Sequence, residues 1–596
     1  MRLIHLPKDI KESIATFLPI LAKMSLALAS NATPRIDEPL SYMTRLMKRH
    51  FPEAPTPFTY NQFKQSVTVN YDGLSKRKRE LFIAVKDLDL DHLEQLNVKI
   101  LDLYQIDKKN CTVLQWIQKS NSLALMDYVY QHIILREIDS IHRVDHSPYQ
   151  NTLLHWVILL RQSSTVLRGV INDGADVNAR RTDTATPLFL AIVERNFPAV
   201  EVLITKPTLK VNQTVEPFGA AALHLACQYG ENRMVRLLLG HSNIAVNSVA
   251  KNGYTPLMTA TRAKKTSTLA ILCAQDGILL DSRDRDGNTA LWMAAYMGYE
   301  EAVKLLLMYD ANVDRPNRQG VTPLCIACRN GHMSILRELI RKNANINHQL
   351  VDGRTPLMIA LLSNQPDLAE FLLNSSQLDA SLGIVDGVTP LHVAVEKRYT
   401  QCVEKIIMRD NVNVNVITAS GVTPLMKAAQ QGFTKILNLL RDYPKIEINK
   451  QNRDSVNALL IATSHQHLEG VESLLYHSGI NPNVITTKGN TPLHIATAQG
   501  NLKIVIELLS HPMTSSKKIN LAGFLPIEIA KRKGYLEIIK VLECHQLLST
   551  IEDDINHHTD LTAHIGLFRS NMATQTLDQI DQLVDELEHS KISHPS

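Results

Sequence analysis

The hydrophobic positions of this chain recur in a short phrase of polar and apolar residues. A threonine precedes Pro-Leu or Ala-Leu, two variable residues and an alanine, and the phrase begins at Thr186, Thr255, Thr289, Thr322, Thr355, Thr389, Thr423 and Thr491. Degenerate copies begin at Thr152, Ala221, Asn457 and Leu525, so that successive copies from Thr152 onward lie 33 to 35 residues apart. Weaker copies begin near Arg79 and Thr112. This fixed period indicates a stack of similar units rather than one compact core.

Each copy predicts two short helices followed by a hairpin turn. The threonine suits the N-cap and the proline suits the first helical position, while the leucine and the alanine share an apolar face. Glycine or asparagine residues then turn the chain with left-handed backbone, at Asn196, Gly230, Gly298, Gly331, Asn364, Gly432, Gly500 and Gly534. Apolar runs such as 303–308 and 505–510 predict the second helices. Asx-Gly pairs at 252–253, 286–287, 352–353 and 386–387 predict the tips of hairpin fingers.

With these motifs in register, residues 76–545 resemble the ankyrin-repeat family, in about 14 units. The resemblance implies an all-α solenoid of helix–turn–helix units with hairpin fingers. Each unit would bury its apolar face only against its neighbours, which leaves an extended surface for protein binding. We expect residues 1–75 and 546–596 to form small helical segments outside the repeats.

Members of the family bind proteins mostly through the fingers and the ends of the first helices. At the corresponding positions, this chain has Lys251, Tyr254, Arg262, Arg285, Tyr296, Arg318, Arg329 and Arg354. Arginine interleaved with tyrosine is typical of interface hot spots. The formal net charge of only +4 favours an acidic protein segment over nucleic acid as the ligand. Ordinary solvated loop charge is the alternative interpretation.

The first 75 residues begin with an amphipathic pattern of their own. The segment resembles an F-box. It begins with Leu-Pro, has isoleucines four residues apart and ends its first helix at Phe-Leu-Pro, and a helix of small residues follows. By this resemblance Leu6, Pro7, Ile10, Ile14 and Leu18 would contact the Skp adaptor of a cullin–RING ubiquitin ligase. A clear third helix and the tryptophan of many F-boxes are missing from the pattern. A helical cap over the first repeat is therefore the alternative.

The last segment, 546–596, has apolar residues at helical spacing within 571–590 and an acidic cluster at Asp581, Asp585, Glu586 and Glu588. It is interpreted either as a capping helix or as a recognition tail, for instance a bacterial secretion signal.

Composition and motifs indicate a protein without catalytic machinery or a cofactor. The seven cysteines are odd in number and have no disulfide-like rhythm, which favours a reducing, cytoplasmic compartment. Cys325 and Cys328 have no second pair nearby to complete a zinc site, and we expect them in the core. The histidines that follow the repeated phrase, such as His224 and His392, are expected to hydrogen-bond neighbouring turns. No apolar run is long enough to span a bilayer.

The leading hypothesis is an adaptor that links a target protein to a cullin–RING ligase. It would act in the cytoplasm, or in the host cytoplasm if the chain is a secreted bacterial effector. The alternative is an ankyrin scaffold or inhibitor with no link to ubiquitin.

Overall fold

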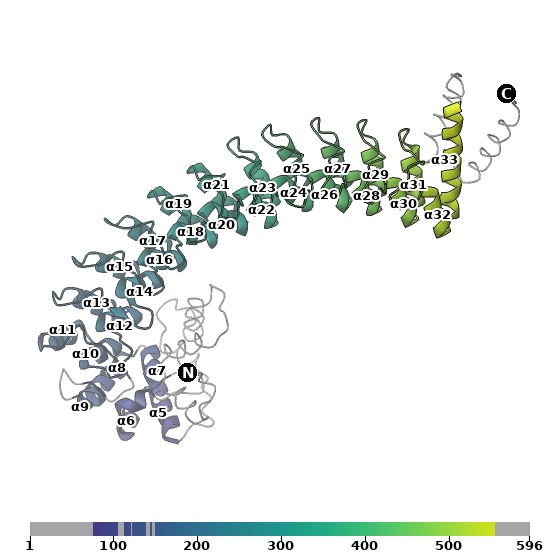
Figure 1. Ribbon diagram of the computed structural model, residues 1–596. Coiled ribbons are helices and arrows are strands. Elements are labelled where there is room, and N and C mark those ends of the chain that lie inside the picture. The colour runs from purple at the N-terminus through teal and green to yellow at the C-terminus, as the bar shows by residue number, and fades with distance from the viewer. Residues whose placement is uncertain (1–75, 105–111, 121, 139–143, 146–148, 555–596) are drawn as a thin grey trace. The chain divides into compact units, whose positions relative to one another are not determined.

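The computed structural model describes residues 76–104, 112–120, 122–138, 144–145 and 149–554 (Figure 1). The chain divides into two units, Met1–Asn312 and Val313–Ser596. The described residues contain fourteen successive helix pairs, from α5–α6 to α32–α33. The all-α repeat fold and the number of repeats predicted from the sequence are therefore confirmed.

The first unit contains the earlier repeats and one short strand pair. Its helices are α5 (Lys76–Asp87), α6 (Leu90–Gln95), η2 (Ile100–Tyr104), α7 (Val113–Ser120), α8 (Leu123–Val129), η3 (Tyr130–Ile134), α9 (Leu135–Glu137), α10 (Leu153–Leu159), α11 (Ser164–Asn172), α12 (Pro187–Val193), α13 (Phe197–Ile204), α14 (Ala222–Tyr229), α15 (Asn232–Leu239), α16 (Pro256–Arg262), α17 (Thr266–Cys273), α18 (Ala290–Tyr296) and α19 (Glu300–Met308). In one finger, β1 (Thr214–Val215) pairs antiparallel with β2 (Ala220–Ala221), and Thr214 lies opposite Ala221.

The second unit repeats the same helix pair with less variation. Its helices are α20 (Pro323–Asn330), α21 (Met333–Arg341), α22 (Pro356–Leu362), α23 (Pro366–Leu373), α24 (Pro390–Glu396), α25 (Thr400–Ile407), α26 (Pro424–Gln431), α27 (Thr434–Arg441), α28 (Ala458–Ser464), α29 (Leu468–Leu475), α30 (Pro492–Gln499), α31 (Leu502–Ser510), α32 (Pro526–Lys533) and α33 (Leu536–Asp554). The last of these has 19 residues and continues past residue 545. The proposed division at 75 and 545 otherwise stays a prediction.

The first helix of each repeat begins as the sequence predicts. Thr186 Oγ1 accepts a hydrogen bond from the Phe189 N–H at 3.2 Å, and Thr322 Oγ1 accepts one from Cys325 at 3.2 Å. A proline follows each threonine at the start of the helix, where its missing N–H removes no intrahelical hydrogen bond. The same local chemistry therefore starts helices in both units.

The turn between the two helices also follows the prediction, with one correction. Seven of the eight expected residues, including Gly230, Gly331 and Asn364, have positive φ. Asn196 does not, because its φ is −82° and its Oδ1 accepts from the Ala199 N–H as the N-cap of α13. Arg195 takes the left-handed position instead, at φ 50°. The Asn196 amide also donates to the Ile158 carbonyl at 3.0 Å, which holds it at the cap.

Within each unit the helices form two layers. First helices pack against first helices of the next repeat, as α16 does against α14 and α18, while second helices such as α15, α17 and α19 pack together. Figure 1 shows the two rows in each unit. The core lies between them, and it is lined by the repeated leucine and alanine, which are at most 1% exposed at Leu257, Ala260, Leu324 and Ala327. Burial of these side chains is the main stabilising term.

A ladder of asparagine side chains connects the loops that follow the second helices. Asn212 Nδ2 donates to the Asn243 carbonyl at 2.6 Å, and its Oδ1 accepts the Ala245 N–H at 2.8 Å. Each such amide satisfies two backbone groups of the next repeat, and it therefore fixes the spacing of the loops. The same double contact is made by Asn178, Asn247, Asn347, Asn415, Asn449 and Asn483.

Candidate functional site

Three of the predicted binding residues lie near one another in the first unit. Arg262 ends α16, and its Nη1 donates to Tyr254 Oη at 2.6 Å, with the guanidinium 5.5 Å from the centre of the tyrosine ring. Tyr254 closes the finger before α16, so this contact ties the finger to the helix. Burial raises the pKa of the Tyr254 hydroxyl, which therefore stays protonated at neutral pH. Lys251, at the tip of the same finger, forms an ion pair with Glu216.

Two further predicted residues, Arg285 and Tyr296, belong to the next repeat. The Arg285 side chain is exposed at the tip of its finger. The Tyr296 ring stacks on Trp292 with the ring centres 5.5 Å apart and the planes 7° apart. Both rings are half-buried, so they form a rigid platform that still meets solvent. Trp292 was not among the predicted binding residues. Its four-residue spacing from Tyr296 on one helix was the signal that could have identified it.

The other three predicted residues lie in the second unit. Arg318 and Arg329 are exposed, and within the described part of the chain neither forms an ion pair. Arg354 differs, because its Nε donates to Asp352 Oδ2 at 2.6 Å. Desolvation alone would raise the pKa of Asp352, but the hydrogen bonds from the Arg354 backbone and side chain lower it. Much of the Arg354 charge is therefore already balanced. The structure describes the predicted set as two separate groups, and their role in binding stays a prediction.

The fingers of the second unit also have bare apolar tips that were not predicted. Val351 is 93% exposed and Val385 is 87% exposed, on neighbouring fingers. Because two exposed valines recur at the same position of neighbouring fingers, these tips are candidate contact points for a partner.

The repeated histidines have the structural role expected from the sequence. His224 Nε2 lies 2.9 Å from the Tyr254 carbonyl oxygen, and His392 Nε2 lies 3.1 Å from that of Val422. In each case Nδ1 accepts the N–H of the residue that caps the same helix. Burial lowers the pKa of both rings, so both remain neutral donors at pH 7. Each ring therefore links one repeat to the finger of the next.

The cysteine pair is part of the core. Cys325 and Cys328 are fully buried, and burial raises the pKa of both thiols, which disfavours the nucleophilic thiolate. Among the residues that the structure describes, no group of three or more His, Cys, Asp or Glu side chains could hold a metal ion.

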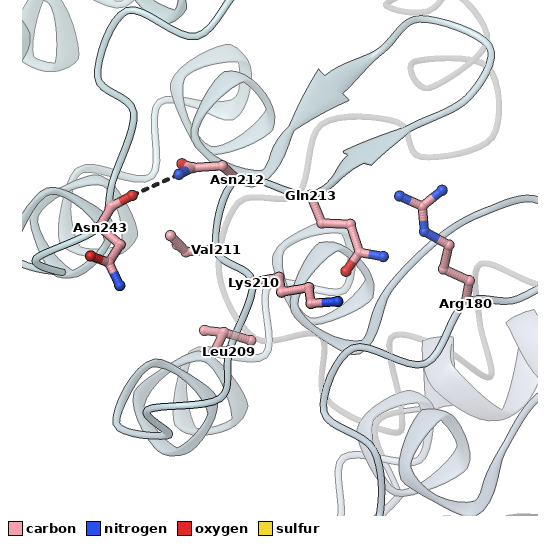
Figure 2. Close-up of a pocket in the computed structure, with 7 residues that line it drawn as sticks. All are labelled: Arg180, Leu209, Lys210, Val211, Asn212, Gln213 and Asn243. Carbon is pink, nitrogen blue, oxygen red and sulfur yellow. Dashed lines mark hydrogen bonds between the residues drawn. The ribbon is translucent and has the colours of Figure 1, made fainter.

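A hollow of about 450 Å³ lies beside a finger of the first unit (Figure 2). It is lined by Arg180, Leu209, Lys210, Val211, Asn212, Gln213 and Asn243. Figure 2 shows the Asn212 amide directed toward the Asn243 carbonyl, as part of the asparagine ladder. The lining residues include two cations and several amides but no acid or nucleophile, so the hollow does not indicate catalysis.

The F-box-like residues Leu6, Pro7, Ile10, Ile14 and Leu18 and the acidic segment 571–590 lie outside the described residues. None of the described helices is both long and apolar enough to cross a membrane.

Comparison with known proteins agrees with the repeat pattern. The family model for ankyrin repeats (3 copies) matches residues 170–250, 223–317, 310–382, 376–454 and 459–553. YahD of Escherichia coli (strain K12), whose name describes ankyrin repeats, is 28% identical over 25% of this chain and 75% of its own length. Inversin of Canis lupus familiaris is 34% identical over 22% of this chain, and protein glp-1 of Caenorhabditis elegans is 30% identical over 30% of it. These matches span only 12% of inversin and 15% of glp-1.

Among solved structures, the chain matches that of the ankyrin repeat protein EF0377. It shares 26% identity, covers 31% of this chain and 96% of its own, and has a TM-score of 0.30.

Proposed function

Because the chain belongs to the ankyrin-repeat family, we propose that it is an adaptor whose first unit binds an acidic segment of a target protein. Ankyrin repeats are scaffolds for protein interaction and are typically not enzymes. A stack of repeats presents a long surface that can be varied without changing the core. The specificity of this chain is therefore expected in its surface side chains.

The observation that supports this proposal is an arginine–aromatic surface in the first unit, formed by Tyr254, Arg262, Arg285, Trp292 and Tyr296. Arg262 is held in place by the Tyr254 hydroxyl at 2.6 Å, so little conformational entropy is lost when it meets a carboxylate. The stacked Trp292 and Tyr296 rings supply a rigid apolar contact on α18, the helix that packs against α16. A guanidinium next to aromatic rings suits an acidic peptide with an apolar side chain.

Affinity capture of a target protein from eukaryotic lysate would test this surface directly. The test variant combines Arg262→Glu with Trp292→Ala. The matched control is Arg236→Glu, an exposed arginine on the second helix α15. We expect wild type and control to recover the same proteins, rich in Asp and Glu, and the test variant to lose at least about 90% of them, because truncating a hot spot costs about 2 kcal/mol or more. Equal recovery by all three chains would show that the target binds elsewhere.

The exposed arginines of the second unit, Arg318 and Arg329, form a separate candidate contact. Arg318→Glu with Arg329→Glu should leave the melting temperature within a few degrees, because both side chains are exposed. If this variant also loses the captured target, both groups contact it. If only the Arg262 and Trp292 variant loses the target, the first unit alone is responsible.

The second part of the proposal is that residues 1–75 bind the Skp adaptor of a cullin–RING ligase, in the cytoplasm of a eukaryotic cell. Its support is the F-box-like spacing of Leu6, Pro7, Ile10, Ile14 and Leu18. Leu6→Ala with Pro7→Ala should abolish binding of purified Skp while the circular dichroism melt of the repeats stays unchanged. A lowered melt without any Skp binding in wild type would instead indicate a cap on the first repeat, and a scaffold without a ubiquitin link.

A further inference from the structure

The last finger of the second unit presents cations and bare apolar side chains together. We define the last-finger surface as Lys488, Lys518, Leu521, Phe524 and Arg532. Leu521 is 80% exposed at the finger tip, and its backbone N–H donates to the Lys488 carbonyl of the preceding finger at 3.1 Å. The Arg532 guanidinium lies 3.9 Å from the centre of the Phe524 ring. Two neighbouring fingers and helix α32 thus contribute residues to this surface.

The cations of this surface are not balanced by neighbouring acids. Lys488, Lys518 and Arg532 form no ion pair within the described residues. The sequence has no Asp or Glu from Met513 to Ile527. On the following helices, Glu528 accepts the Leu525 N–H at 2.7 Å and Glu543 pairs with Lys531 at 3.0 Å, while Glu537 lies in the first turn of α33. An anion bound at this surface would therefore compensate the positive charge of these three side chains.

The same chain carries a segment of complementary chemistry. Residues 571–590 contain five carboxylates, Asp578, Asp581, Asp585, Glu586 and Glu588, and no Lys or Arg. Between the carboxylates, Leu577, Ile580, Leu583, Val584 and Leu587 recur at helical spacing, which gives one apolar face with acids beside it. An acidic amphipathic segment matches a surface of lysine, arginine, leucine and phenylalanine.

The distance between the two partners is within reach of the intervening chain. Ser516 Oγ lies 3.1 Å from His545 Nδ1, so α33 passes the loop that leads into the last finger. From His545 the helix continues to Asp554, about 13 Å further at 1.5 Å per residue. The 16 residues 555–570 can span at most about 53 Å when fully extended.

We propose that residues 571–590 dock in cis on the last-finger surface. The carboxylates meet Lys488, Lys518 and Arg532, and the apolar face covers Leu521 and Phe524. The segment thereby shields the apolar finger tip from water and from outside partners. This docking is independent of the arginine–aromatic surface of the first unit.

Zero-length carbodiimide cross-linking of the full chain tests the proposal, because it joins a lysine to a carboxylate only when the two are in contact. An equal mixture of unlabelled and 15N-labelled chain separates cross-links within one molecule from those between two. We expect Lys488 or Lys518 to be joined to acids of 571–590 within single chains. Cross-links between light and heavy chains would overturn docking in cis and show a second copy as the occupant.

Charge reversal provides the matched comparison. Asp581→Lys with Asp585→Lys should reduce the cross-links of the remaining Asp578, Glu586 and Glu588 by about tenfold. Asp173→Lys with Asp410→Lys changes the net charge equally at exposed positions outside the segment and should leave them unchanged. An equal loss in both variants would overturn the specific contact, since only general electrostatics would then be involved.

A thiol reporter gives a second readout that needs no lysine. Leu521→Cys and Val385→Cys place a cysteine at the same position of two fingers, and the six described native cysteines are all buried. We expect the thiol at 521 to react with a maleimide about tenfold more slowly than the thiol at 385, and the Asp581→Lys, Asp585→Lys change to remove this difference. Equal rates in the starting chain would overturn the proposal. Binding of phosphatidylserine vesicles through Lys488 and Lys518, without tail cross-links, would overturn it in favour of a lipid surface.

Discussion

Fingers of the two units share a backbone but can carry different side chains at their tips. Four residues before the helix-starting threonine, the first unit has Lys251 and Arg285, whereas the second has Val351 and Val385 beside the cationic Arg318. The turn glycines that follow have nearly the same φ, 85° and 82° in the first unit and 85° and 74° in the second. Because the backbone is the same, the fold does not require either kind of side chain. The side chains at the finger tips are therefore free to vary with the partner that each unit binds.

The buried positions show the opposite behaviour. The leucine of the repeated phrase is 1% exposed at Leu257 in the first unit and fully buried at Leu357 in the second. Here the fold requires the side chain, since each repeat gains its stability by burying this face against its neighbours. The comparison separates the buried residues that stabilise the repeat from the exposed residues that are available for binding.

The largest effect should come from this common core. Leu257→Ala and Leu357→Ala should each lower the free energy of unfolding by about 2 to 5 kcal/mol, because each leaves a cavity between two helix layers. Urea unfolding of both variants beside wild type measures the loss. If one variant fell within this range and the other lost less than about 1 kcal/mol, the two units would not be equivalent in packing, and the difference in their fingers could not be assigned to binding alone.

Most of the repeat could be predicted from the sequence, because its determinants are local. Thr322 caps a helix by bonding to a residue three positions on, and Gly331 turns the chain through its own φ. Asn196 was assigned to the wrong position of its turn because its amide bonds to Ile158, 38 residues away. Such a contact exists only after the repeats have stacked.

The candidate surface was less predictable for the same reason. A list of finger and helix-end positions identified Tyr254 and Arg262, but not their contact with each other or the Trp292 platform. Exposure is decided by neighbouring repeats, and the sequence alone did not distinguish Val385, which is 87% exposed, from the half-buried Val388 three residues later.

Acid should destabilise the chain through His155 more than through His392. Burial, followed by the Arg181 charge, lowers the pKa of His155 to about 3 against the opposing effects of Asp183 and of backbone hydrogen bonds, and burial also lowers the pKa of His392, where the Val422 carbonyl opposes it. A lowered folded-state pKa contributes stability that is present above the unfolded value of 6.5 and is lost as the pH falls toward 3. Between pH 7.5 and 5 this amounts to about 2 kcal/mol for His155.

The substitution His155→Gln isolates this contribution, because glutamine can keep the capping contact to Thr152 without titrating. Wild type should lose about 2 kcal/mol more than the variant between the two pH values in urea unfolding. His392→Gln should reduce the acid sensitivity by less. A wild type and a His155→Gln variant with the same pH dependence would show that the pKa of His155 does not change on folding.

The smallest effect on stability, and the most informative one, should come from exchanging the finger tips. The two variants are Arg285→Val in the first unit and Val351→Arg in the second unit. Together they exchange the side chains at the two finger tips. Both positions are exposed, and both fingers are closed by an acidic side chain that accepts backbone N–H groups, Asp284 in one and Asp352 in the other. Neither contact involves the exchanged side chain, so each variant should change the free energy of unfolding by no more than about 0.5 kcal/mol.

Target binding should respond differently to the two substitutions. Arg285→Val should weaken binding of the captured target and reduce the salt dependence of that binding, because the variant lacks one charge that attracts carboxylates. Val351→Arg should leave that target unaffected. Titration calorimetry at low and high salt measures both outcomes, and a stability loss above about 2 kcal/mol in either variant would show that the finger tips belong to the fold after all.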